Sequence, residues 1–231
     1  MEQGAAKSGD FQGVFAALVE ANSSKPVAAP LAAFLDRCMA APDLRKSVKD
    51  SLPALLADIA HFLNISHGRH PGIIDHAASK MIDADARSWL TQSTTAFAAE
   101  RAFLNRLTVA AGPIRRHTDQ DKIEALLAGQ HRSFEMLATS DRRGCPAGAA
   151  FAFVLDWQAT RGLLDRAALM LGIANPPCDL PDAHATFEMA RRLAISPAVE
   201  RAMAFGGEQL LAQQKGLWKL IAARHQATIE L

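Results

Sequence analysis

The sequence lacks most of the features from which a function is read directly. It contains no tyrosine, no glycine-rich phosphate loop, no nucleophile elbow, no His-Glu-x-x-His zinc motif and no Cys-x-x-Cys pair. Hydrolase and nucleotide-binding functions therefore have no support from motifs. A basic excess is also missing, since 25 Lys and Arg residues against 24 Asp and Glu residues leave a formal charge of +1. We expect no nucleic-acid partner, because such proteins neutralise phosphates with an excess of cations.

The three cysteines form no recognisable motif, and a leader segment and a long apolar run are both absent from the sequence. Cys38, Cys145 and Cys178 are odd in number and lack the spacing of metal ligands, which favours free thiols in a reducing compartment. The chain starts with no basic segment followed by an apolar one, and no stretch has the length of a membrane span. These absences predict a cytoplasmic protein without a membrane partner.

The residues that are present favour helices. Hydrophobic residues make up 49% and charged residues 21% of the 231 positions, alanine is frequent, and runs of Val, Ile and Thr are few. No Ser/Gly-rich or charge-rich tract divides the chain, whose length is within reach of one core. The sequence therefore predicts an all-α, single-domain helix bundle over residues 1–231, with 1–10 disordered.

Apolar periodicity and the positions of proline and glycine predict where the helices begin and end. Residues 147–171 are apolar on nearly every side, which is typical of a central helix surrounded by others. A connector is expected from Pro26 to Pro30, a helix end near Asn64, and a break between two helices at Gly206-Gly207.

Two carboxylates fall on apolar helix faces. At 100° per residue, Glu100 aligns with the apolar stripe of its helix, and Asp156 shares a face with small residues of the central helix. Both are expected to be buried, and a buried carboxylate needs an arginine, a histidine, a metal or a proton. Arg101, Arg106 and Arg161 are the candidate counter-charges.

A third group lies along one edge of the helix that starts near Asp119, where Glu124, His131 and Glu135 are separated by seven and four residues. Helix bundles build di-iron and di-manganese centres from such residues, usually with Glu-x-x-His pairs. This sequence has no Glu-x-x-His, although the Glu124 to His131 spacing is similar to a ligand pair of heme-oxygenase-like bundles. The candidate iron or manganese ligands are Glu100, Glu124, His131, Glu135 and Asp156. The alternative is a network of Arg–carboxylate ion pairs.

Three histidines crowd into the segment SHGRHPGIIDHAASK, where Gly68, Pro71 and Gly72 interrupt the helical pattern. Backbone N–H groups and imidazoles of such a turn could hold an anion or a metal. The alternative is a rigid connector with solvated histidines. If the protein has a ligand site, we expect His67, His70 and His76 at its rim.

Several stretches together resemble an uncharacterised bacterial family of helical proteins of unknown function. They are HGRHPGIIDHA, ERAFLNRLTVAAGP and HRSFEMLATSDRRGCPAGAAFAFVLDW, and they cover roughly the middle half of the chain. The resemblance implies a shared fold but no activity, so no catalytic residue follows from it.

Three hypotheses of function remain, and the sequence leaves open whether the protein is an enzyme. The first is a helix bundle that binds a small apolar ligand or a protein partner. The second is a metal-dependent oxidase-like enzyme in a ferritin-like or heme-oxygenase-like bundle, using the five ligands named above. The third is a haem protein with a histidine ligand.

Overall fold

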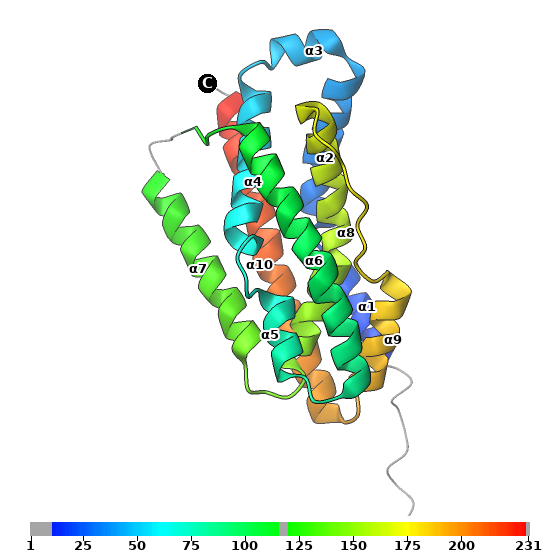
Figure 1. Ribbon diagram of the computed structural model, residues 1–231. Helices are drawn as coiled ribbons and strands as arrows, with labels where there is room; N and C mark the ends of the chain where they lie inside the picture. Colours follow the sequence, from blue (N-terminus) through cyan, green and yellow to red (C-terminus); the bar gives the residue numbers. More distant parts are fainter. Residues whose placement is uncertain (1–10, 116–119, 230–231) are drawn as a thin grey trace, which may run out of the picture.

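The computed structural model describes residues 11–115 and 120–229, and within these ranges it consists of helices without strands (Figure 1). The all-α prediction is confirmed, whereas the predicted disorder of residues 1–10 lies outside the described residues. None of the helices in the described ranges is long and apolar enough to span a membrane. The helices are α1 (Phe11–Asn22), α2 (Lys25–Ala40), α3 (Pro42–Ser47), α4 (Ser51–His67), α5 (Ile73–Lys80), α6 (Ala84–Ala111), α7 (Gln120–Thr139), α8 (Cys145–Leu171), α9 (Ala183–Leu193) and α10 (Pro197–Ile229).

Helix α8 is the centre of the bundle. It packs most extensively against α10 and also contacts α1, α2, α4, α5, α6, α7 and α9 (Figure 1). Its aromatic side chains Phe151, Phe153 and Trp157 are completely buried. The apolar central helix predicted for residues 147–171 is therefore confirmed, with two further residues at its start.

Helices α8 and α10 approach one another so closely that glycine is required at the contact. A Cβ atom added to Gly206 would lie 2.2 Å from the carbonyl oxygen of Cys145, and one added to Gly148 would lie 2.1 Å from that of Met203. The predicted break at Gly206-Gly207 is wrong, because α10 runs through both residues without interruption. Here glycine permits close backbone packing and does not end a helix.

Two other predicted boundaries are also wrong. The expected connector from Pro26 to Pro30 belongs to α2, which starts at Lys25. Pro26 lies in the first turn, where a missing N–H costs no hydrogen bond, and Pro30 is exposed, so that water can reach the carbonyl left without a donor. Helix α4 extends past Asn64 to His67, so that this histidine lies on the helix and not in the following turn.

Three turns meet at the lower end of the bundle in Figure 1. They join α5 to α6, α7 to α8, and α9 to α10. Helix α5 lies between α6 and α7, with contacts to both and to α8. The two pockets described below lie along α5, one near its first residues and one at the three turns.

Candidate functional site

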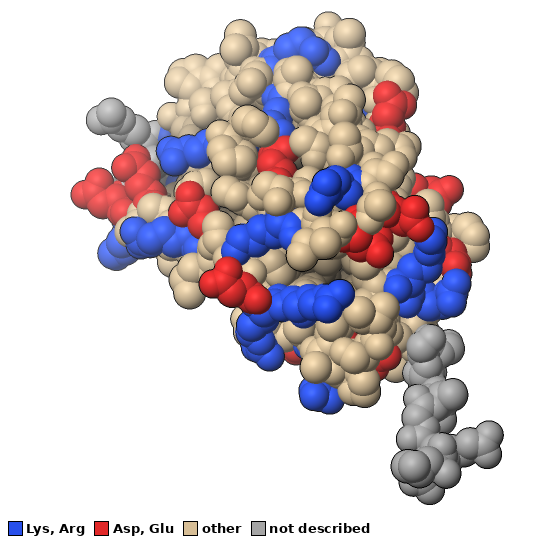
Figure 2. All heavy atoms as spheres, turned by 60° about the horizontal axis from the view of Figure 1, so that its bottom comes forward, with Lys and Arg blue, Asp and Glu red and all other residues tan. Residues whose placement is uncertain are grey.

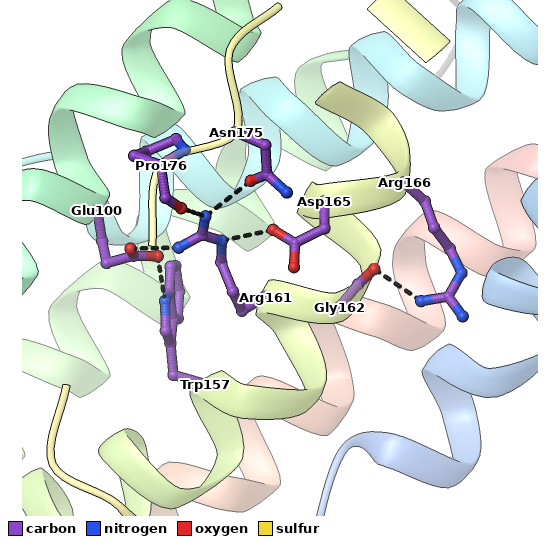
Figure 3. Close-up of polar contacts among 8 residues, drawn as sticks. All are labelled: Glu100, Trp157, Arg161, Gly162, Asp165, Arg166, Asn175 and Pro176. Atoms are coloured by element: carbon purple, nitrogen blue, oxygen red, sulfur yellow. Dashed lines mark hydrogen bonds and ion pairs between the residues drawn. The ribbon is translucent and has the colours of Figure 1, made fainter. Parts of the chain in front are cut away.

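Glu100 is buried in an ion-pair network at the junction of α6 and α8 (Figure 3). Its Oε1 accepts a hydrogen bond from Nη1 of Arg161 at 2.6 Å, and its Oε2 accepts one from the Trp157 indole at 2.8 Å. The Arg161 guanidinium lies over the ring of Phe103, 4.5 Å from its centroid. The burial of Glu100 was predicted, and Arg161 was among the predicted counter-charges.

The same arginine ties the segment after α8 to the bundle. Its Nε donates to Asp165 at 2.7 Å, and its Nη2 donates to the Asn175 side chain at 2.8 Å and to the Pro176 carbonyl (Figure 3). Burial raises the pKa of the Glu100 carboxyl, and the hydrogen bond from Trp157 and the charge of Arg161 oppose this shift. These contacts match the Arg–carboxylate ion pairs that the sequence offered as the alternative to a metal site.

Asp156 is engaged elsewhere, at the turn between α1 and α2. Its Oδ1 accepts hydrogen bonds from the backbone N–H of Ser24 at 2.8 Å and from the Ser23 hydroxyl at 3.0 Å. Burial raises the pKa of this carboxyl, against the hydrogen bonds from the two serines. The predicted burial of Asp156 is confirmed, and the residue fixes the turn that starts α2.

The other predicted metal ligands lie on α7. His131 and Glu135 form a pair, with 3.3 Å between Nε2 and Oε1, and Glu124 is exposed. Within residues 11–115 and 120–229, no three His, Cys, Asp or Glu side chains are arranged to hold a metal ion. The structure therefore does not gather the five predicted ligands in one place, and iron or manganese binding stays a prediction.

A small cavity of about 30 Å³ lies where α4, α5, α6 and α7 meet, and we call it the histidine pocket. Two of the three predicted rim histidines line it, His67 and His76, together with His131 and Glu135 of α7. The third, His70, is exposed outside it, with its Nδ1 3.3 Å from Asp75. Arg69 and Arg101 add two guanidinium groups to the lining.

The first turn of α5 fixes one wall of this pocket. Asp75 accepts a hydrogen bond from the backbone N–H of Gly72 at 2.7 Å, which caps the helix. The same carboxylate oxygen pairs with Nη2 of the buried Arg101. The Arg101 guanidinium also lies over the ring of Phe97, 4.9 Å from its centroid. The Asp75–Arg101 ion pair therefore connects α5 to α6.

His67 is a neutral imidazole held among aromatic rings. Its Nε2 lies 2.8 Å from Oε1 of Gln214 on α10, and the ring packs against Phe153 and Trp157 of α8. Burial lowers the pKa of His67 to about 4. Because Gln214 Oε1 can only accept, Nε2 carries the proton and Nδ1 keeps its lone pair. Nothing in the periodic pattern of α10 identifies Gln214 as the partner.

A second, larger pocket opens at the three turns, and we call it the basal pocket. Its volume is about 870 Å³. Residues of all three turns line it, and its apolar residues come from the α5–α6 and α9–α10 turns and from the helices beside the turns. The apolar residues are Ala77, Met81, Ile82, Pro146, Ala147, Leu193, Ile195 and Val199. Figure 2, which brings this end forward, shows basic side chains around a hollow, with carboxylates among them.

The charged residues of the basal pocket have a small positive excess, with three basic and two acidic side chains. Lys80, Arg142 and Arg143 line it together with Asp83 and Asp141. Lys80 pairs with Asp141 at 2.9 Å, and the Arg142 guanidinium lies 5.2 Å from the centroid of the Phe205 ring. Arg143 is exposed and forms no ion pair with any described residue. One guanidinium at the rim is therefore free for a ligand.

Sequence reasoning did not identify the basal pocket. The segment SDRRGCP carries two adjacent arginines to which the sequence pattern assigns no function. The signal present in the sequence was a pair of adjacent arginines in one turn and an isoleucine in each of two other turns. In the structure Ile82 is 90% and Ile195 is 62% exposed. Apolar side chains of that size are normally buried.

Comparison with known protein families gives a match over residues 36–228, which include every residue that lines the two pockets. The chain belongs to a family of unknown function (DUF6975). The resemblance to an uncharacterised family is thereby confirmed. Neither the curated proteins nor the solved structures give a match.

Proposed function

We propose that this protein binds an amphipathic small molecule with an apolar body and an anionic head group in the basal pocket. The observation that carries the proposal is the combination, around one cavity, of exposed isoleucines and an arginine without an ion pair to any described residue. The cavity volume of about 870 Å³ falls within the range of small-molecule sites, which is roughly 300–1,000 Å³. The proposal specifies the small apolar ligand that the sequence suggested.

The apolar part of the ligand would cover Ile82, Ile195 and Met81. Removing such side chains from water contributes about 25 cal/mol for each Å² buried. Arg143, at the opening, would bind the head group through its planar guanidinium, which matches a carboxylate or phosphate in a two-point hydrogen bond. The start of α8 supports an anion there as well, since Gly144 leaves the first turn without a side-chain cap and the helix dipole is positive at this end.

Calorimetric titration of the purified chain with decanoate and with decanol tests the proposal. We expect saturable binding of both, below their aggregation limits, with decanoate the tighter ligand. Arg143→Gln should remove most of the preference for decanoate, and Ile195→Ser should weaken both ligands. Arg132→Gln is the matched control, because Arg132 is exposed and lines neither pocket. Absence of saturable binding, or equal binding by all variants, would refute the proposal.

A protein partner is the second candidate function, and the observation that favours it is the size of the exposed apolar surface at this end. Besides the two isoleucines, Phe205 is 42% exposed beneath Arg142. An apolar surface with a basic rim suits an acidic amphipathic helix of another protein. In that case decanoate would give no saturable heat, whereas Phe205→Ser would reduce the recovery of one specific partner from an extract.

A further inference from the structure

The histidine pocket contains a buried cation whose donors are mostly unused. Arg101 is 7% exposed, and Asp75 engages only its Nη2. Its Nε is buried and has no hydrogen-bond partner in the described part of the chain. A guanidinium carries five N–H donors, and a buried donor without a partner is costly. Arg101 also lines this pocket, so a guanidinium with an unpartnered N–H among the described residues belongs to the pocket wall.

A second arginine, Arg69, lines the same cavity. It is exposed and makes no ion pair with any described residue. The only carboxylate in the lining belongs to Glu135, and it is paired with His131 at 3.3 Å. Asp75 lies behind Arg101 and does not line the cavity. The titratable residues that line the cavity are thus Arg69, Arg101, which is paired with Asp75, Glu135, which is paired with His131, and the histidines His67, His76 and His131.

We propose that the histidine pocket binds a small oxyanion, a phosphate or a carboxylate, between Arg69 and Arg101. The cavity of about 30 Å³ has room for about two water molecules, which matches the two oxygens of a carboxylate or two of the four oxygens of a phosphate. Guanidinium groups recognise both anions through paired N–H donors. The imidazole of His76 can add one N–H donor at the wall. This site is independent of the proposed function of the basal pocket.

Gly72 has no side chain, and this leaves room for the Arg101 guanidinium beside it. A Cβ atom at this position would lie 2.9 Å from Nη2 of Arg101, closer than side chains tolerate. The contact is with the end of a flexible side chain, so a Gly72→Ala variant can fold by moving the guanidinium. Such a variant disturbs the oxyanion site but keeps Arg101 close to the buried Asp75. Arg101→Ala, by contrast, would leave the buried Asp75 carboxylate without a counter-charge and destabilise the protein.

The experiment is a titration of the full chain with inorganic phosphate and, separately, with acetate, at constant ionic strength set with chloride. Calorimetry measures affinity, and the Nε–H resonance of Arg101 in a heteronuclear NMR spectrum reports on the site itself. We expect saturable binding of at least one of the anions, with a shift of that resonance. Arg69→Gln should weaken the binding about tenfold, the effect of one charge-assisted hydrogen bond. Gly72→Ala should weaken it at least as much.

Two controls separate this site from general charge effects. Gly129→Ala places a methyl group in open space on α7, and Arg132→Gln removes an exposed charge outside the pocket. Both should bind as the wild type does. Binding of phosphate alone or acetate alone identifies the anion. The proposal is overturned if neither anion binds saturably, or if Arg69→Gln and Gly72→Ala bind like their controls.

Discussion

The close contact between α8 and α10 makes a sharp prediction about Gly206. Its added Cβ would lie 2.2 Å from a backbone carbonyl oxygen, so the two helices must separate by roughly 1 Å to restore an ordinary contact. Overpacking costs about 1–3 kcal/mol where side chains can move, and we take about 4 kcal/mol here because the obstacle is backbone. Alanine recovers about 1 kcal/mol through its higher helix propensity. We expect Gly206→Ala to lower the free energy of unfolding by about 3 kcal/mol.

Gly216 on the same helix provides the matched control, because nothing lies within 4 Å of its added Cβ. Gly216→Ala keeps the gain in helix propensity without the clash and should stabilise the protein by about 0.5–1 kcal/mol. Urea denaturation followed by circular dichroism measures both variants. In thermal unfolding, a loss of about 3 kcal/mol corresponds to a midpoint about 6–12 °C lower for a chain of this length.

The response of a double variant tests the mechanism. Gly148→Ala alone should be as destabilising as Gly206→Ala, because its Cβ meets the backbone of Met203. Once one substitution has separated the helices, the other costs less, so the double variant should lose less than the sum of the two. If Gly206→Ala is as stable as Gly216→Ala, or if the two clashing substitutions add fully, the helices are not in backbone contact.

Three further predictions concern buried polar groups. Because the pKa of His67 is about 4 against an ordinary 6.5, the unfolded chain binds a proton in this interval that the folded chain does not, and the free energy of unfolding should fall by about 3 kcal/mol from pH 7 to pH 4. His67→Gln should remove this part of the dependence in urea titrations, and an unchanged slope would contradict the assignment. Asp58→Ala leaves buried Arg224 without its two-point partner and should cost about 3–5 kcal/mol in the same assay, whereas near-wild-type stability would mean that water replaces the carboxylate. Elemental analysis of the purified protein tests the predicted metal site, and iron or manganese lost in a Glu100→Ala, His131→Ala double variant would overturn the ion-pair interpretation of Glu100.

The local sequence pattern was sufficient to predict most helices and the burial of two carboxylates. It did not identify the partners of the buried polar groups. The 100° rotation per residue placed Glu100 and Asp156 on buried faces, and the structure buries both. The partner of Asp156 is a turn 132 residues earlier, and the partner of His67 is an amide 147 residues later. Helical periodicity describes the face of one helix at a time, so it carries no information about the neighbour that a face meets.

The glycine pair in α10 shows why a local rule can fail for a physical reason. Gly206 and Gly207 lower helix propensity, which by itself favours a boundary. The backbone contact with α8 outweighs that cost, because only residues without a side chain allow the approach. The same argument applies to the pockets. The basal pocket is built from three turns that are distant in sequence, and each turn alone shows only an exposed isoleucine or a pair of arginines. The three turns form a pocket only because close packing of the helices brings them together.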